Sequence, residues 1–325
     1  MRIFSGMRPT GQLHIGNYFG AAKNWLELQK KHNCIFAVVD YHGITTPFDP
    51  KKIQKDIMDV VLDYLAAGIN PKKSILMIQS HIPEHTELAW ILGTLTPLGE
   101  LERMTQFKEK AQQHQKNVNA GLFVYPILMA ADILLYKTNL VPVGHDQLQH
   151  VELARTLARK FNNKFNEVFP IPRAQLPKIG ARIMSLNDPA EKMSKSLGPQ
   201  SYIALSDSLD VIRKKIKTAV TDSGKEIKYD EKKKPAISNL LTIYRLFSNK
   251  SIVDLEKKYK NKGYAEFKKD LAEVIIKGLK PFQEKRKKLE KNPQLIKKIL
   301  AEGEKKAEKI AKETIKEVKK KMGLI

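Results

Sequence analysis

Residues 2–17 read RIFSGMRPTGQLHIGN, and this stretch decides how the first half of the chain folds. Its opening run, Arg2 to Gly6, is short and apolar and predicts a buried strand. A turn with Pro9, Thr10 and Gly11 follows, and a helical pattern then runs from about Asn17 to Lys31. A strand that feeds a helix through such a turn commonly holds phosphates on its backbone N–H groups.

A second motif, Lys192-Met193-Ser194-Lys195-Ser196, begins 178 residues after His14. Its two lysines and two serines lie between Pro189 and Gly198-Pro199, which is typical of a mobile loop that closes over polyphosphate. Each motif alone is weak, because the first resembles an ordinary helix cap and the second a solvated basic loop. Together, in this order, they predict two halves of one ATP site.

Strand and helix patterns alternate along the first half. Three more apolar runs predict buried strands at residues 34–41, 74–79 and 139–143, and helices are expected at residues 49–68, 84–95 and 146–162. This alternation predicts an α/β fold, a Rossmann-like doubly wound parallel sheet. Ligands bind at the carboxyl ends of such strands, which places residues 6–17, 40–45 and 144–147 at one mouth.

The second half is helical and lysine-rich, so we expect a catalytic domain at 1–200 and a C-terminal α-helical domain at 201–325. A final amphipathic helix is expected at residues 302–322, with Ala307, Ala311 and Val318 on its apolar stripe. The net charge is +23, and residues 251–325 hold 23 Lys or Arg against 12 acidic residues. That excess suits a polyanion such as nucleic acid, although a lysine-biased surface is the alternative.

The single cysteine and the hydropathy pattern limit where the protein works. Cys34 can form no internal disulfide and offers no zinc cluster, so a reducing cytoplasm is the expected compartment. The longest nearly apolar run, residues 122–136, contains Asp132 and is shorter than the ~20 residues that span a bilayer. We therefore expect no membrane partner and no protein-bound structural metal.

Asp132 is a carboxylate in the otherwise apolar helical run from Met129 to Tyr136. A buried carboxylate is costly unless a donor meets it. One interpretation is a structural carboxylate paired with a lysine or a backbone amide, or one at a solvent-facing edge. The other is an acceptor for the N–H group of an apolar ligand. Tyr125, seven residues earlier, lies on about the same helix face if Pro126 does not break the register.

These motifs resemble the class I aminoacyl-tRNA synthetases, and the chain is similar from end to end to the bacterial tryptophanyl-tRNA synthetases. The specific stretches are residues 99–108 and 125–136, since the His14-Ile15-Gly16-Asn17 and Lys192–Ser196 motifs alone give only the class. The resemblance implies a tryptophan–tRNA ligase that forms tryptophanyl-adenylate from L-tryptophan and ATP. It then transfers tryptophan to the terminal ribose of tRNA(Trp).

The resemblance also implies roles for individual residues. Lys192 and Lys195 would be catalytic and meet the departing polyphosphate. The ATP site would include Arg8, Pro9, Thr10, His14, Gly16, Asn17, Gly144, His145, Asp146, Ile183, Lys192, Met193, Ser194, Lys195 and Ser196. Asp132 would accept the indole N–H. The other tryptophan-binding residues would be Tyr125 and Gln147 at the ammonium group and Phe4, Gly6, His42, Met129, Val141 and Val143 around the indole.

Some implications concern partners and departures from the family pattern. Mg²⁺ would arrive with ATP, the basic helical domain would bind the anticodon arm, and the enzyme would be a homodimer. Arg8 and His145 stand where many members have glutamine and an acid. Three alternatives stay open at this point: a tyrosyl-type synthetase, another nucleotidyltransferase that needs no tRNA, and a tRNA-binding module that has lost catalysis.

Overall fold

A computed structural model describes residues 1–113, 118–176 and 182–325 of the chain. Two compact units make up the chain: Met1–Gly11, Trp25–Lys178 and Asn292–Ile325 form the first, and Gln12–Asn24 and Ile179–Lys291 form the second. This division differs from the boundary expected near residue 200. The segment after the first strand belongs to the second unit, and the last helix belongs to the first.

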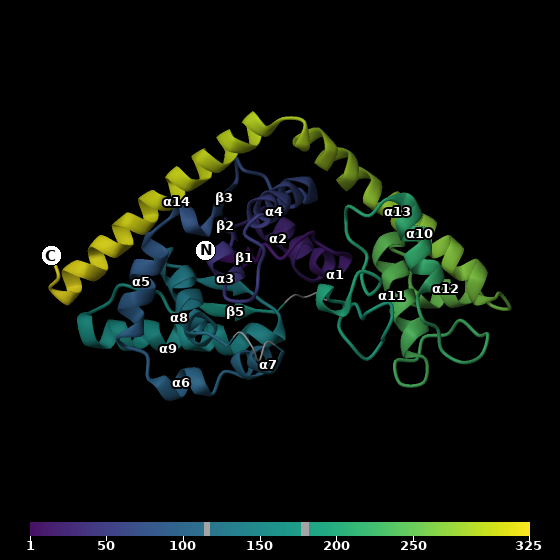
Figure 1. Cartoon of the computed structure of the whole chain (residues 1–325), viewed down its shortest axis with the longest axis horizontal. Helices are drawn as coiled ribbons and strands as arrows, with labels where there is room; N and C mark the ends of the chain where they lie inside the picture. The colour runs from purple at the N-terminus through teal and green to yellow at the C-terminus, as the bar shows by residue number, and fades with distance from the viewer. Residues whose placement is uncertain (114–117, 177–181) are drawn as a thin grey trace. The chain divides into compact units, whose positions relative to one another are not determined.

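A five-stranded parallel sheet forms the centre of the first unit (Figure 1). Its order is β3-β2-β1-β4-β5, with β1 Arg2–Met7, β2 Asn33–Val38, β3 Ser74–Ile78, β4 Leu140–Pro142 and β5 Arg173–Gln175. Phe4 is paired with Ile35 between the two central strands. The four expected strands and the doubly wound parallel arrangement are confirmed. The edge strand β5 was not predicted, because its three residues form no apolar run.

Helices flank the sheet and follow the predicted alternation. They are α3 Asp40–Gly43, α4 Ile53–Ala67, α5 Glu84–Gly93, α6 Leu98–Glu102, α7 Thr105–Gln113, α8 Ala120–Leu135, α9 Leu148–Phe165 and α14 Pro293–Met322. Short 3₁₀ turns, η2 Gln79–His81 and η4 His145–Gln147, follow β3 and β4. Pro126 lies inside α8, so the helix continues through it and the Tyr125–Asp132 register is preserved.

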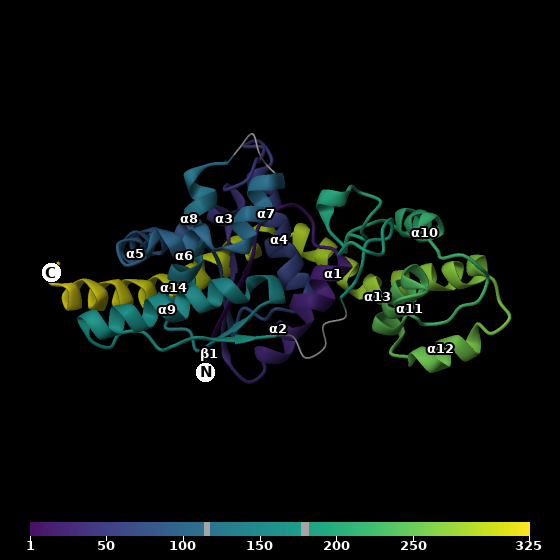
Figure 2. The same cartoon turned by 90° about the horizontal axis from the view of Figure 1, so that it is seen from below.

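The two faces of the sheet are covered by different helices, because strand side chains alternate between faces. Phe4, Ile35 and Met77 face a core built with α5, α8 and α9, which lie side by side in both views (Figures 1 and 2). On the other face Phe36 stacks on Trp25 at 5.1 Å, and Tyr64 of α4 meets Trp25 edge-on. Both faces of the sheet are therefore buried, as is usual for a parallel sheet.

The second unit is helical. It contains α1 Ile15–Asn17, the π-helical turn η1 Tyr18–Ala22, the 3₁₀ turn η5 Lys195–Leu197, α10 Leu209–Thr218, α11 Pro235–Ser248, α12 Ile252–Lys258 and α13 Tyr264–Glu290. Helix α2, Lys23–Leu28, begins in this unit and ends in the first. Backbone hydrogen bonds from Ile15 to Ile203 and from Leu205 to Leu13 hold residues 12–24 in this unit.

Helix α14 packs along the edge strand β3 and on α5 (Figure 1). The expected apolar stripe is confirmed, since Ala307, Ala311 and Val318 are buried in the core of the first unit. Gly303 makes the close approach possible, because a Cβ at this position would overlap the carbonyl oxygen of Leu76. The helix therefore rests directly on the backbone of β3.

Gly303→Ala should destabilise the protein by about 1–3 kcal/mol, because the added methyl group must push α14 away from β3. Urea unfolding followed by far-UV circular dichroism measures the change. Gly93→Ala is the matched control at the end of α5, where the added Cβ would lie 3.9 Å from Ile127 in ordinary contact. Equal free energies of unfolding for the two variants would contradict this account of how α14 packs on β3.

Candidate active site

Side chains from the carboxyl ends of several strands meet around α8 in the first unit. Phe4 and Gly6 lie on β1, and His42 lies in α3 directly after β2. Val141 lies on β4, with half-buried Val143 just beyond it. These are five of the expected tryptophan-binding residues, and the topology of the sheet gathers them at one edge, as for other parallel α/β sheets.

Asp132 of α8 is only 1% exposed and accepts three hydrogen bonds from side chains. Its Oδ1 atom lies 2.7 Å from Gln79 Nε2 and 2.6 Å from His85 Nδ1. Its Oδ2 atom lies 2.8 Å from His42 Nε2. The donors come from α3 and from the consecutive elements η2 and α5, so this carboxylate joins two distant parts of the sequence to α8.

Two opposing effects act on the pKa of Asp132. Burial raises it, but the charge and hydrogen bond of His42, together with His85, outweigh burial and hold the pKa well below its usual range. The carboxyl group is therefore ionised at neutral pH and can only accept hydrogen bonds. It follows that His42 Nε2 and His85 Nδ1 carry the protons in these two hydrogen bonds.

The structure corrects one expectation about Asp132. The structural interpretation expected a lysine or backbone-amide partner or a solvent-facing edge, and instead histidine and glutamine side chains hold a buried carboxylate. The role of Asp132 as an acceptor for a ligand N–H stays a prediction. Gln79 and His85 were not among the candidate residues. Their signal was indirect, since a buried aspartate demands donors but its own sequence neighbours do not reveal which distant residues supply them.

Tyr125 and Met129 lie on α8, on the N-terminal side of Asp132. The Tyr125 hydroxyl lies 2.8 Å from His150 Nε2 of α9, and its ring meets His42 edge-on at 6.0 Å. Burial raises the pKa of Tyr125, partly opposed by the charge of Arg8, so the hydroxyl keeps its proton. Gln147 of η4 donates from Nε2 to Asp146 at 2.8 Å.

Several expected ATP-binding residues also belong to the first unit. Arg8 and Pro9 follow β1, and burial lowers the pKa of the Arg8 guanidinium. Thr10 is exposed. Gly144, His145 and Asp146 form the turn after β4, with both His145 and Asp146 exposed.

The His14 motif forms a capped helix start in the second unit. His14 precedes α1 as its N-cap, accepts a hydrogen bond from the Asn17 backbone at Nδ1, and donates from its own backbone to the Asn17 side chain, both at 3.3 Å. Gly16 is tightly enclosed, because a Cβ there would lie 2.9 Å from the His14 ring. The expected helix from residue 17 to 31 is thus divided among α1, η1 and α2.

The lysine motif lies close enough to His14 for its charges to act there. Burial, and then the positive charges of Lys195 and Lys192, lower the pKa of His14 to about 3. His14 is therefore neutral at pH 7, with Nδ1 as an acceptor and Nε2 as the protonated nitrogen. The sequence expectation that these distant motifs come together is consistent with this geometry.

The loop at 192–196 is anchored by its apolar and hydroxyl side chains. Met193 is 2% exposed, and its backbone N–H donates to buried Ile183 at 3.0 Å. The Ser194 and Ser196 hydroxyls lie 2.8 Å apart at the start of η5. Lys192 is exposed and Lys195 half-buried, so the anchored turn presents two cations.

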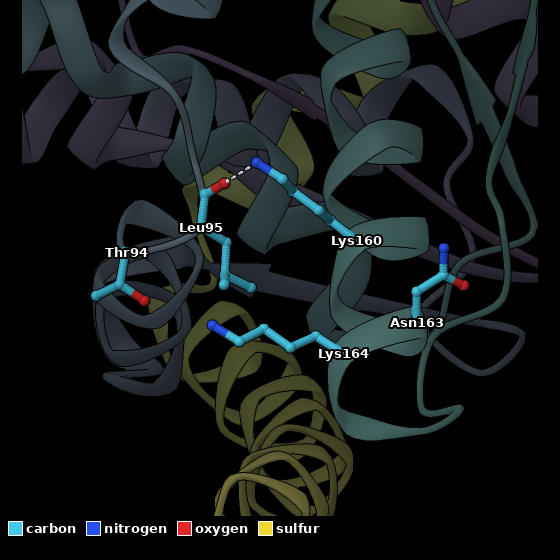
Figure 3. Close-up of a pocket in the computed structure, with 5 residues that line it drawn as sticks. All are labelled: Thr94, Leu95, Lys160, Asn163 and Lys164. Atoms are coloured by element: carbon cyan, nitrogen blue, oxygen red, sulfur yellow. Dashed lines mark hydrogen bonds between the residues drawn. The ribbon is translucent and has the colours of Figure 1, made fainter.

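Other features of the described residues carry no comparable chemistry. Across 1–113, 118–176 and 182–325 we find no cluster of three His, Cys, Asp or Glu side chains fit to hold a metal ion, and no helix suited to cross a membrane. A hollow of about 450 Å³ is lined by Thr94, Leu95, Lys160, Asn163 and Lys164 (Figure 3). Lys160 donates there to the Leu95 carbonyl at 2.9 Å, and the hollow holds no expected site residue.

Cys34 has no role in this chemistry. It is a free thiol buried on β2, and burial raises its pKa to about 11. A protonated, buried thiol is a poor nucleophile.

Known proteins resemble the chain over almost its whole length. The proteins from Halalkalibacterium halodurans and Bacillus subtilis, both named tryptophan–tRNA ligase, are each 50% identical over 323 residues, which is 99% of this chain and 97% of theirs. The crystal structure of the Campylobacter jejuni tryptophanyl-tRNA synthetase complexed with ADP and tryptophan is 39% identical. Its TM-score is 0.87 over 99% of this chain and 100% of that one. The model of the family described as tRNA synthetases class I (W and Y) matches residues 1–280, and the chain belongs to this family.

Proposed function

We propose that this chain binds tryptophan at Asp132 and ATP through the His14 and Lys192–Ser196 motifs, and that its second unit binds tRNA. Relatives at 50% identity are tryptophan–tRNA ligases, and this chain is a tryptophan–tRNA ligase as well. It forms tryptophanyl-adenylate from ATP and then transfers tryptophan to tRNA. The tyrosyl alternative and a module without catalysis are both disfavoured by this identity.

The buried, ionised carboxylate of Asp132 carries the proposal for tryptophan. Among the residues that the structure describes, Oδ1 has two donors and Oδ2 has His42 alone, so Oδ2 has capacity for a second N–H donor. The indole N–H of tryptophan fits that capacity, and Phe4, His42 and Met129 supply flat or flexible apolar surface beside it. Because His42 already donates to Oδ2, a ligand without an N–H leaves the carboxylate partly satisfied and costs less than a wholly unpaired charge would.

In Asp132→Asn the two donors at the Oδ1 position should hold the amide oxygen there, which places the NH₂ group, a donor only, in the position of Oδ2. The substitution should therefore lower kcat/KM for tryptophan by about 10- to 100-fold, the usual cost of losing a hydrogen bond to a charged group. The KM for ATP should not change. Wild type should also prefer tryptophan over 3-benzothienylalanine, in which sulfur replaces the indole N–H, and Asp132→Asn should lose that preference. Amino-acid-dependent pyrophosphate exchange measures both.

Met129→Leu is the matched control, because it conserves side-chain volume on the same helix and keeps the carboxylate. It should preserve the preference for tryptophan over the sulfur analogue. A wild-type enzyme that activates both amino acids equally would contradict the assignment of Asp132.

We infer an electrostatic role in adenylate formation for three residues of the second unit, His14, Lys192 and Lys195. The tryptophan carboxylate attacks the α-phosphate, the bond to the bridging oxygen breaks, and negative charge grows on the departing pyrophosphate. Lys192 and Lys195 supply positive charge, and neutral His14 supplies an N–H donor at Nε2. Mg²⁺ bound to ATP would share the neutralisation.

Lys195→Ala should slow adenylate formation about 100- to 1000-fold, because its ammonium meets charge that is largest in the transition state. Tryptophan affinity should change little, since its proposed pocket is in the other unit. Single-turnover measurements separate the two effects. Leu197→Ala in the same turn is the control, and an unchanged rate with weaker ATP binding would reduce Lys195 to a ground-state anchor.

We assign binding of the anticodon arm to the helical second unit. The basic excess of residues 251–325 is divided between the units: residues 251–291 hold 13 basic and 7 acidic residues, whereas α14 holds 10 lysines and 5 glutamates. Within the second unit, a hollow of about 570 Å³ is lined by five lysines, among them Lys225, Lys257 and Lys260, and by two glutamates, Glu226 and Glu256. This excess of cations suits contacts with the phosphates of an RNA backbone.

Reversing three of these charges, Lys225→Glu with Lys257→Glu and Lys260→Glu, should weaken tRNA binding. The slope of log affinity against log salt should become shallower by about one for each phosphate that is no longer neutralised. Filter binding at several salt concentrations measures it. Lys31→Glu with Lys72→Glu and Lys73→Glu changes the charge equally on exposed residues of the first unit. Equal decreases in affinity for the two triple variants would contradict a specific role for the second unit.

We also propose a homodimer in the cytoplasm. Trp90 of α5 and Leu98 of α6 are 79% and 68% exposed, and large exposed apolar side chains are typical of protein interfaces. Sedimentation equilibrium decides the assembly, and a monomer at micromolar concentration would contradict it. The free thiol of Cys34 and the need for ATP and tRNA support a cytoplasmic location, which cell fractionation tests.

A further inference from the structure

A second set of hydrogen bonds lies on the Oδ1 side of Asp132, away from His42. His85 in the first turn of α5 is fully buried, and its two ring nitrogens meet different partners. Nδ1 lies 2.6 Å from Asp132 Oδ1, and Nε2 lies 2.8 Å from the Tyr136 hydroxyl. The imidazole therefore connects the carboxylate to a tyrosine one turn further along the chain, at the end of α8.

The proton on the Asp132 side of His85 follows from the ionised carboxylate, which can only accept, so Nδ1 carries the proton of that hydrogen bond. Burial raises the pKa of Tyr136 well above its usual value, so its hydroxyl keeps its proton. The Tyr136 hydroxyl lies 2.8 Å from His85 Nε2 and 3.3 Å from the thioether of Met77. When His85 is neutral, with its single proton on Nδ1, Tyr136 donates to Nε2 and stabilises that tautomer.

Tyr136 is itself held in place by packing. Its ring is stacked on Phe4 of β1, with 5.6 Å between centroids and an angle of 9° between planes. It is fully buried, as is His85. The Tyr136 hydroxyl that meets His85 Nε2 is therefore held in place by Phe4, and Phe4 is itself expected to line the indole pocket.

The hydrogen bonds to Asp132 are asymmetric, and this asymmetry has a functional consequence. Gln79 and His85 both bind Oδ1, so rotation about the Cβ–Cγ bond would break two hydrogen bonds to a charged oxygen. The carboxylate plane is thereby fixed, and Oδ2 has a single donor within the described part of the chain. A fixed acceptor selects for a ligand N–H in one direction, as preorganised sites do.

We propose that His85, oriented by Tyr136, is a positioning residue for amino-acid selection: it holds Asp132 Oδ1 so that Oδ2 faces the ligand N–H. This inference rests on the proposed role of Asp132 in binding the indole. It assigns to His85 no contact with the ligand, and its effect is exerted through the orientation of the carboxylate.

Two substitutions at His85 distinguish a role in positioning the Asp132 carboxylate from a purely structural role in the core. Asn places an amide near the position of Nδ1 and keeps a donor for Asp132, whereas Gln places its amide near Nε2 and loses that donor. The measured quantity is the ratio of kcat/KM for tryptophan to kcat/KM for 3-benzothienylalanine, in pyrophosphate exchange. His85→Gln should lower this ratio about tenfold, whereas His85→Asn should stay within about twofold of wild type. The KM for ATP should be unchanged in both.

Each result bears on the proposal. A wild-type ratio in His85→Gln would overturn it, and so would an equal decrease in both variants, because that is what a purely structural role predicts. If wild type itself does not distinguish the two amino acids, the proposed function of Asp132 fails and this inference fails with it. That pattern is visible in the wild type alone, so the two failures are distinguishable.

A second measurement does not depend on whether the His85 variants fold. Long-range ¹H–¹⁵N correlation spectra of ¹⁵N-histidine-labelled wild-type enzyme report which ring nitrogens carry protons. One conservative variant, Tyr136→Phe, which keeps the ring stacked on Phe4, identifies the His85 signals by their shift. We expect a proton on Nδ1, and an imidazole protonated on Nε2 alone would overturn the proposal.

Discussion

The carboxylate of Asp132 has no access to water, and removing a charge from water costs several kcal/mol unless polar partners replace the solvent. Those partners come from α3, which follows β2, and from η2 and α5, which follow β3. The requirement to satisfy one charge thus couples the ends of β2 and β3 to α8. Disturbing any of these segments would leave a donor or the acceptor buried without a partner.

The chemistry of the second unit depends on the opposite situation, an excess of positive charge around a neutral group. Burial, reinforced by the charges of Lys195 and Lys192, keeps the His14 imidazole from taking up a proton near neutrality. A neutral imidazole beside two ammonium groups adds a directed N–H donor without adding repulsion. The arrangement is suited to bind a polyanion whose charge increases during the reaction.

The position of α14 in the first unit changes the interpretation of the basic residues near the C-terminus. Sequence charge alone groups the last 75 residues into one basic module, but α14 belongs to the sheet unit and packs on β3 through Gly303. Its apolar stripe is buried against α5 and α8, and Lys319 pairs with Glu87 of α5. Part of the positive charge near the C-terminus therefore belongs to a helix that stabilises the sheet unit.

The sequence by itself determined the parallel α/β fold, four of the five strands and the two motifs that we propose bind ATP. Apolar runs bounded by turns, and glycine and proline at the ends of elements, are local signals, and each of those features is local. Asp132 was singled out for the same reason, since a lone charge interrupts an apolar helix. The short edge strand Arg173–Gln175 lacked such a run and was missed.

Only the tertiary structure decided which side chains meet. Gln79, His85 and His42 are 53, 47 and 90 residues from Asp132 in the sequence, and no local pattern records that they share one carboxylate. The division into two units could likewise not be predicted from the sequence. It depends on the backbone hydrogen bonds of residues 12–24 and on the fit of Gly303 against Leu76. Hydrogen bonding and close packing depend on distances between atoms, and the chain sets those distances only when its distant segments have folded together.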